Sequence, residues 1–225
     1  GISIGLGVMP IALAAGGIAG GMQPFTLLVQ TLPIIFCSVL LMLGLQLFPR
    51  GTVKAFTVFS KLLQAASTAG LTLGAFQYIT GLRLIARLTP LEEAMKTVSA
   101  IGIVMLGSLP TAEILRRALS KPFNRIGEKL GMRDCSLAAL LIGCVSAVPA
   151  LAVLKDMDDR GQTVNAAFLV CAASALAAHL GFTLSVEPNM AVPLLLTKFL
   201  GGFCGIAAAL LLTGKAERRR KGQRS

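Results

Sequence analysis

Long apolar runs separated by short polar interruptions make up most of the chain. A helix that crosses a bilayer needs about 20 predominantly apolar residues. Six runs reach about this length, and each predicts a transmembrane helix. They cover residues 2–20, 25–48, 55–79, 136–154, 164–184 and 191–212. The pattern therefore predicts an all-α, polytopic integral membrane protein.

A further apolar piece, residues 98–109, is shorter and stops at Pro110. It predicts either a span that kinks at the proline and continues to Leu115, or a re-entrant half-helix. Its length does not separate these two structures. The chain thus has about seven hydrophobic segments, of which six or seven are spans.

The longest polar stretch, residues 116–134, intersperses charged side chains with apolar ones at helical spacing. This predicts an amphipathic helix that lies at the membrane interface. Its apolar residues are Leu119, Phe123, Ile126 and Leu130. We therefore expect one transmembrane helical domain over residues 1–213, with an interfacial segment at about 116–135, and a basic tail over residues 214–225.

Glycine is frequent inside the apolar runs. Small residues four positions apart let helix backbones approach closely in lipid, and such faces could also join two copies of the chain. These pairs are Gly16/Gly20, Gly17/Gly21, Gly70/Gly74 and Gly201/Gly205. In the first run, the density of glycine together with Pro10 predicts a discontinuous helix.

The composition agrees with membrane embedding. Hydrophobic residues make up 55% of the chain and charged residues 14%, whereas a soluble domain carries about 25% charged residues. The net charge of +11 does not indicate nucleic acid, because no aromatic residues are interleaved with the basic ones to stack on bases. Six of the 21 Lys and Arg residues lie in the last eleven positions, which favours a cytoplasmic C-terminus beside the lipid bilayer.

The chain carries no pattern typical of an enzyme or a metal site. The five cysteines lack metal or redox spacing, and the single histidine cannot form a histidine-rich site. No nucleophile–base pair, nucleotide-binding loop or pair of carboxylates is evident. We expect no catalysis, no cofactor and no bound metal.

Two polar residues inside predicted spans are the main candidates for function, because polar groups in hydrocarbon are costly. His179 could bond substrate or relay a proton, or it could bond only a backbone carbonyl of a neighbouring helix. Lys198 could snorkel to the interface or pair with a carboxylate, and Glu187 is the acid nearest to it in sequence. The lesser candidates, each expected to bond within its own helix or to a neighbour, are Ser174, Thr183, Ser146 and Asn165.

Several motifs resemble the ethanolamine-utilisation permease family EutH. The densest match begins at Met157-Asp158-Asp159-Arg160-Gly161 and continues through Ala178-His179-Leu180-Gly181-Phe182 to Lys198-Phe199-Leu200-Gly201-Gly202. Looser similarity extends upstream through Leu106-Gly107-Ser108-Leu109-Pro110. The combination is more specific than any single piece.

The resemblance implies a bacterial inner-membrane protein that takes up ethanolamine, a small-molecule substrate. It also implies a longer full chain, of which this sequence would be the C-terminal half. The matching polar positions are Asp158, Arg160, Asn165, His179, Asn189 and Lys198. Of these, Asp158 and Arg160 would form a loop pair that fixes two helix ends or gates access.

The charge partner of the substrate stays open at this point, and so do two alternative functions. The spans contain no Asp or Glu beyond their ends, so the partner of an ethanolammonium ion lies elsewhere, or the neutral amine is carried, or the substrate differs. A transporter of another small polar or cationic metabolite is the first alternative. A membrane scaffold that recruits partners or anionic lipid through residues 116–134 and the basic tail is the second.

Overall fold

A computed structural model describes the backbone of residues 1–82, 84–85, 88–130 and 132–222, and most side chains outside 108–131 and 215–225. Within these residues the chain forms helices and no strands, which confirms the all-α prediction. The α-helices are α1 (Ile2–Ala19), α2 (Pro24–Leu47), α3 (Pro49–Thr80), α4 (Leu91–Leu130), α5 (Asp134–Val145), α6 (Ala147–Ala152), α7 (Asp159–Ala172), α8 (Ala178–Val186) and α9 (Ala191–Gly222). Two 3-10 turns, η1 (Leu154–Asp156) and η2 (Pro188–Met190), precede α7 and α9.

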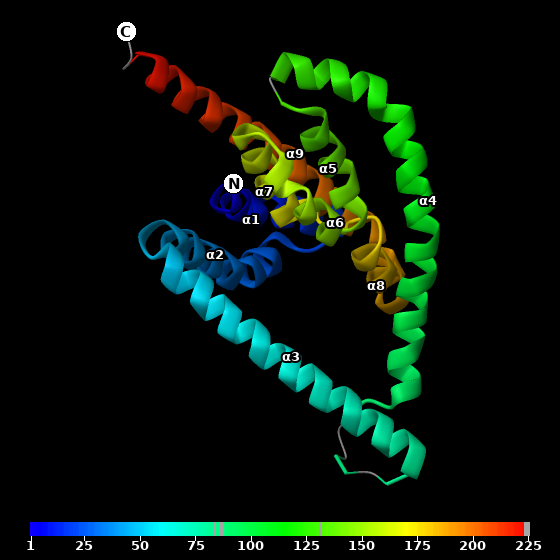
Figure 1. Ribbon diagram of the computed structural model, residues 1–225. Coiled ribbons are helices and arrows are strands. Elements are labelled where there is room, and N and C mark those ends of the chain that lie inside the picture. The colour runs from blue at the N-terminus through cyan, green and yellow to red at the C-terminus, as the bar shows by residue number, and fades with distance from the viewer. Residues whose placement is uncertain (83, 86–87, 131, 223–225) are drawn as a thin grey trace.

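The helices form a bundle with two long arms (Figure 1). In the bundle, α1 packs against α2, α7 and α9, while α5 packs against α7 and α6 packs against α5. The arms are α3 and α4, which extend away from the bundle and approach each other near the connection at residues 81–90. The C-terminal half of α4 lies away from α3 (Figure 1), and α4 packs against α5 and α8.

The core lies where α5, α7 and α9 meet. It is formed by buried apolar residues, among them Leu137, Leu140, Val164, Phe168 and Ala209. Helix α9 approaches its neighbours through glycine, because a Cβ at Gly201 would lie 2.8 Å from Ala12 Cβ and 2.9 Å from Cys171 Cβ. A Cβ at Gly205 would lie 3.0 Å from the Ala167 carbonyl oxygen. The predicted close packing at Gly201/Gly205 is therefore confirmed.

The other glycine pairs do not all behave in this way. Gly16 lies against Thr197 and Gly17 against Leu27, so both serve close packing of α1. A Cβ at Gly70 would meet nothing within 4 Å, and the nearest atom to one at Gly74 is 3.8 Å away. The prediction that Gly70/Gly74 packs against another helix is wrong for the part of the chain that the structure describes.

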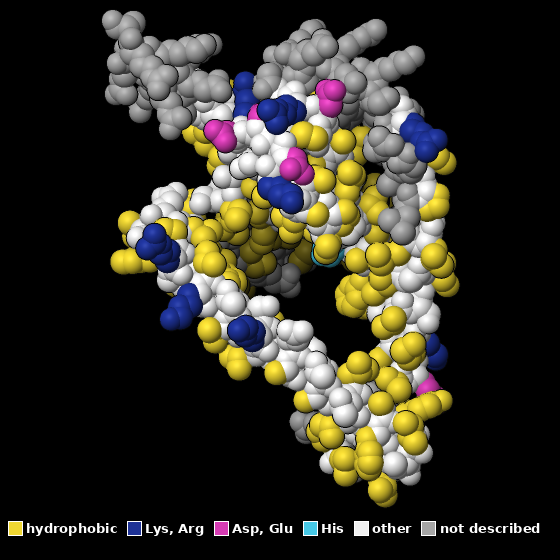
Figure 2. Space-filling view, in the orientation of Figure 1, with side chains coloured by type: hydrophobic (Ala, Val, Ile, Leu, Met, Phe, Trp, Pro, Cys, Tyr) yellow, Lys and Arg dark blue, Asp and Glu magenta, His cyan; other side chains and the backbone are white. Residues whose placement is uncertain are grey.

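Among the residues that the structure describes, three helical segments are long and apolar enough to cross a membrane: Ile2–Ala19, Pro24–Leu47 and Pro188–Gly214. They coincide with the first, second and last runs predicted from the sequence. Figure 2 shows broad apolar surface on the bundle and arms, while charged side chains gather at the end of the bundle where α5 and α7 begin. An integral membrane protein exposes its apolar surface to lipid in this way.

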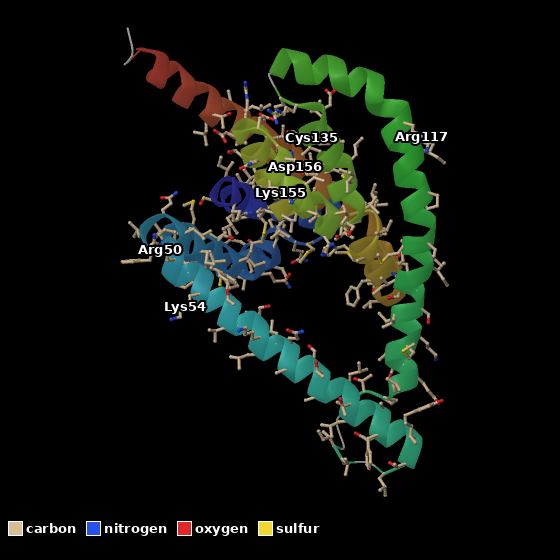
Figure 3. The ribbon with its side chains drawn as sticks, in the orientation of Figure 1. Arg50, Lys54, Arg117, Cys135, Lys155 and Asp156 are labelled. Atoms are coloured by element: carbon tan, nitrogen blue, oxygen red, sulfur yellow. The ribbon has the colours of Figure 1, made fainter. Side chains whose placement is uncertain are left out.

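The run at residues 55–79 is helical but does not have the apolar character of a span by the same measure. It lies within α3, a helix of 32 residues that also carries Lys61 and, near its start, Arg50 and Lys54 (Figure 3). Large apolar side chains on α3, such as Phe56 and Leu62, are exposed. This helix therefore combines a basic first half with uncovered apolar surface.

Residues 98–109 are not a separate half-helix. They lie inside α4, whose 40 residues stay helical through Pro110. Proline is tolerated within helices of membrane proteins when neighbouring groups satisfy the freed backbone. The backbone of the predicted interfacial segment is helical as far as Leu130. The side chains on which that prediction rests, and those of the basic tail from 215 onward, lie outside the described residues.

Helix breaks occur in two runs that the sequence predicted to be continuous. The run at 136–154 is interrupted at Ser146, which separates α5 from α6, and the run at 164–184 is interrupted at residues 173–177, which separate α7 from α8. Pro149 contributes to the first break, because it has no N–H to continue the α5 ladder. The break predicted in the first run is wrong, since α1 is helical through Pro10.

Candidate functional site

The two helix breaks are joined to each other by backbone hydrogen bonds. The N–H of Ser174 donates to the Gly143 carbonyl at 2.8 Å, and the N–H of Leu176 donates to the Cys144 carbonyl at 2.8 Å. The last carbonyls of a helix have no partner within it. The unwound segment at 173–177 supplies those partners to α5 and satisfies its own N–H groups at the same time.

Ser174 adopts the left-handed conformation within this segment, with φ of 53°. That conformation is unfavourable for a residue with a side chain. It turns the chain so that the Ser174 carbonyl receives the backbone N–H of His179 at 3.2 Å. Hydrogen bonds therefore join the segment at 173–177 both to the end of α5 and to the start of α8.

His179 lies in the first turn of α8, and its side chain is exposed. Its Nδ1 lies 3.3 Å from the Ser174 carbonyl oxygen. A carbonyl can only accept a hydrogen bond, so this contact is a hydrogen bond in the ring form that carries a proton on Nδ1; in the tautomer protonated there alone, Nε2 is an acceptor. The backbone bond expected from the sequence is present, and the second ring nitrogen faces away from it as a hydrogen-bonding group.

Lys198 is half-buried on α9, and its Nζ donates to the Ala173 carbonyl at 3.4 Å. Ala173 is the C-terminal cap of α7. A cation at this position meets the negative end of the helix dipole. Glu187, the acid nearest in sequence, instead accepts a hydrogen bond from Asn189 Nδ2 at 3.2 Å. Lys198 is thus bound to a backbone carbonyl at the break rather than to that carboxylate.

Asp158 caps the start of α7. Its carboxylate accepts hydrogen bonds from Gly161 N at 3.0 Å, Ser136 Oγ at 2.8 Å and Arg133 N at 3.1 Å. Partial burial would by itself raise the pKa of this carboxyl, but these hydrogen bonds outweigh burial and lower the pKa below its ordinary value. Its described partners do not include Arg160, so the structure does not join the two as an ion pair.

The loop before α7 also closes on the start of α5. The Cys135 thiol donates to the Asp156 carbonyl at 3.6 Å (Figure 3). Asn165 is fully buried, and its Nδ2 donates to the carbonyls of Ser136 at 2.8 Å and Gly161 at 3.0 Å. Asn165 and Asp158 therefore hold α7 against α5.

The predicted site residues thus fall into separate groups. The break brings together Ser174, His179 and Lys198, while Asp158 and Asn165 lie together at the start of α7. Asn189 lies apart from both groups in the turn before α9. The residues that the family resemblance suggested together therefore lie at three different places in the structure.

A cavity of about 270 Å³ lies between α1, α2, α8, η2 and α9. Its polar lining includes Gln30, Thr31, Thr183 and Thr197. The remaining lining residues are Leu13, Gly16, Gly17, Met22, Leu27, Ile34, Met190, Pro193 and Leu194. The sequence analysis named Thr183 as a lesser candidate but missed Thr31 and Thr197. Their signal was hydroxyl groups inside apolar runs, and Thr197 stands directly before Lys198.

Known proteins resemble the chain over nearly its whole length. The model of the family described as "Ethanolamine utilisation protein, EutH" matches residues 1–212. A protein of Listeria monocytogenes named "Probable ethanolamine permease EutH" is 34% identical over 98% of this chain and 59% of its own length. Proteins of the same name from Escherichia coli and Salmonella typhimurium are each 31% identical over 96% of this chain.

The chain spans 58–59% of the length of these curated relatives. This corrects the expectation of a C-terminal half, because the aligned share is closer to three-fifths. No solved structure matches the chain. With the family model covering all but the last 13 of 225 residues, the chain belongs to the ethanolamine utilisation protein family EutH.

Proposed function

We propose that the complete protein carries a small amino alcohol, ethanolamine, across the bacterial inner membrane without changing it chemically. The observation that carries this proposal is the pair of joined helix breaks beside Lys198 and His179. Irregular backbone at membrane depth is tolerated where protein buries it or where it lines a cavity. Transporters use such discontinuous helices to present backbone groups to a polar substrate.

The relatives support the same conclusion, since three of them are named as probable ethanolamine permeases. A permease needs a site that replaces part of the hydration of its substrate and releases it again. The break has both kinds of group for this task. Lys198 is a donor held at the end of α7, and His179 Nε2 is an acceptor on the first turn of α8.

We further propose that Asp158 maintains the break from a distance. It fixes the start of α7 against α5, and the unwound segment follows the other end of α7. Arg160 lies on the same first turn of α7 and is proposed to contribute to opening or closing of this end of the bundle.

The direct test is uptake of radiolabelled ethanolamine by cells that depend on the complete protein. His179→Ala should impair uptake at limiting ethanolamine while membrane insertion stays normal. His179→Asn should retain part of the activity, because its amide can still donate to the Ser174 carbonyl. Normal uptake by His179→Ala at normal expression would remove His179 from the site.

Competition identifies the substrate. Unlabelled small amines and alcohols, added across a range of external pH, should reduce ethanolamine uptake in proportion to their similarity to ethanolamine. If another polar metabolite is taken up and ethanolamine is not, the protein is a transporter with a different substrate. If nothing is taken up, and deletion of residues 214–225 releases bound partners, the membrane scaffold is the correct function.

A further inference from the structure

The cavity described above lies between the three segments that are long enough to cross a membrane. It is lined by the last third of α1, the first half of α2 and the start of α9, and α8 completes it. These parts meet at one end of the helices, where α1 connects to α2. The cavity is therefore a chamber toward one end of these helices, and Thr197 in its lining stands on the same turn of α9 as Lys198.

Two of the threonines that line the cavity donate their hydroxyl protons to backbone carbonyls of their own helices. Thr31 Oγ1 donates to the Leu27 carbonyl at 2.7 Å, and Thr197 Oγ1 donates to the Pro193 carbonyl at 2.9 Å. A hydroxyl has one proton and two lone pairs. Because each proton is used within its own helix, each oxygen can act toward a ligand in the cavity only as an acceptor.

The rest of the lining agrees with a ligand that donates. No Lys, Arg, Asp or Glu is among the residues that line the cavity. Gln30 and Thr183 also line the cavity and can donate as well as accept, so they do not distinguish a donating ligand from an accepting one. A carboxylate or phosphate would still meet the two acceptor oxygens of Thr31 and Thr197, and no cation in the lining would balance its charge. The apolar lining, which includes Leu13, Ile34 and Leu194, suits a short hydrocarbon portion.

We propose that this cavity is a binding site for small primary amines that also carry a hydroxyl group. An amino group and a hydroxyl supply several N–H and O–H donors for Thr31 and Thr197, and the methylene groups contact the apolar wall. The same chemistry rejects analogues that carry a carboxylate, such as serine. The proposal rests on the proposed function and deepens it, because it names a chamber and a selection rule that the helix breaks do not supply.

Gly16 allows the close contact between α1 and α9 at the wall of the cavity. A Cβ at Gly16 would collide with Thr197 Oγ1 and would lie 3.0 Å from the Pro193 carbonyl oxygen. Glycine at this position therefore lets α1 approach α9 with the Thr197 hydroxyl between them. Gly17 has the same role toward Leu27 of α2.

The test uses valine in place of threonine, because valine has nearly the same shape and lacks the hydroxyl. Thr31→Val and Thr197→Val should each raise the KM for ethanolamine uptake by the complete protein about tenfold, as expected for the loss of one hydrogen bond. Thr213→Val is the matched control. Its hydroxyl also donates to a carbonyl of its own helix, Ala209, at 2.8 Å on the same α9, but it does not line the cavity.

Competition provides the second measurement. Small primary amino alcohols should compete with ethanolamine uptake, whereas serine should not. The proposal is overturned if both cavity variants keep the KM of the Thr213→Val control, or if serine competes as well as an amino alcohol. Failure of the proposed function is seen separately, as absence of ethanolamine uptake by the unsubstituted protein.

Discussion

The ammonium group of Lys198 lies 3.4 Å from the backbone carbonyl oxygen of Ala173. Lys198 belongs to α9, one of the candidate spans, and Ala173 ends α7 where the helix breaks. This contact ties the irregular segment to a continuous helix. It also places a cation at the negative end of the α7 dipole.

Lys198→Met should weaken this link while keeping the length of the side chain. We expect the free energy of unfolding of the detergent-solubilised protein to fall by about 1–2 kcal/mol, because the carbonyl of Ala173 loses a charged hydrogen-bond donor. Uptake of ethanolamine should fall as well. Lys61→Met, which removes an exposed lysine from α3, serves as the control and should change neither quantity. Equal behaviour of the two variants would show that the contact has no structural or functional weight.

Asp158 predicts a defined dependence of stability on pH. Its pKa in the folded protein is lower than its ordinary value, so the unfolded chain binds the proton more readily. The stabilisation is therefore complete above the unfolded pKa of about 4, and is lost as the pH falls through the lower pKa of the folded state.

The measurement is the unfolding midpoint of the solubilised protein between about pH 6 and pH 3. The difference in stability between the unsubstituted protein and Asp158→Asn should shrink toward the acid end of this range. Asp156→Asn, which changes a carboxylate two residues away, is the control. The difference in stability between this variant and the unsubstituted protein should stay the same across the pH range. A constant gap between the unsubstituted protein and Asp158→Asn would contradict the assigned hydrogen bonds.

Gly201 should not tolerate even a methyl group. Gly201→Ala would bring its Cβ to within 2.9 Å of both Ala12 Cβ and Cys171 Cβ, so α9 would have to move away from α1 and α7. We expect destabilisation of about 1–3 kcal/mol, as for overpacking in other cores. Gly214→Ala on the same helix meets nothing within 4 Å and should be neutral or slightly stabilising. A thermal unfolding series on both variants gives the comparison.

Ser174 should accept glycine better than a branched residue. At a φ of 53°, Ser174→Gly removes a backbone penalty of about 1 kcal/mol, whereas Ser174→Val increases it because β-branched residues are strongly disfavoured there. Stability should therefore rank Gly above Ser above Val. The opposite ranking would indicate that the serine hydroxyl, and not the backbone turn, is the important group at this position.

The sequence by itself determined the class of the protein and the location of three candidate spans. Hydropathy is a property of each segment alone, so the runs that became α1, α2 and the apolar part of α9 could be recognised without knowing their neighbours. The spacing of glycines also indicated how α9 packs, since Gly201 and Gly205 do lie at close contacts. The motif around Asp158 indicated the family for the same local reason.

Only the tertiary structure decided where the helices break. Pro10 suggested a break that α1 does not have, whereas residues 173–177 contain no proline and still leave the helix. Their N–H groups donate to carbonyls about 30 positions earlier in the chain, at Gly143 and Cys144. Such a partner is invisible to a local pattern, because the free energy of leaving the helix depends on whether another helix offers an acceptor.

The residues that line the cavity could not be predicted from the sequence for a related reason. Thr31, Thr183 and Thr197 come from three different helices, and each taken alone is a hydroxyl that an apolar helix can satisfy by bonding its own carbonyl. Packing of these helices brings the three residues to one chamber, and at Thr197 it requires the close approach of α1 to α9 at Gly16. Local hydropathy thus determined which segments enter the membrane, and packing between distant segments determined which polar groups face one another there.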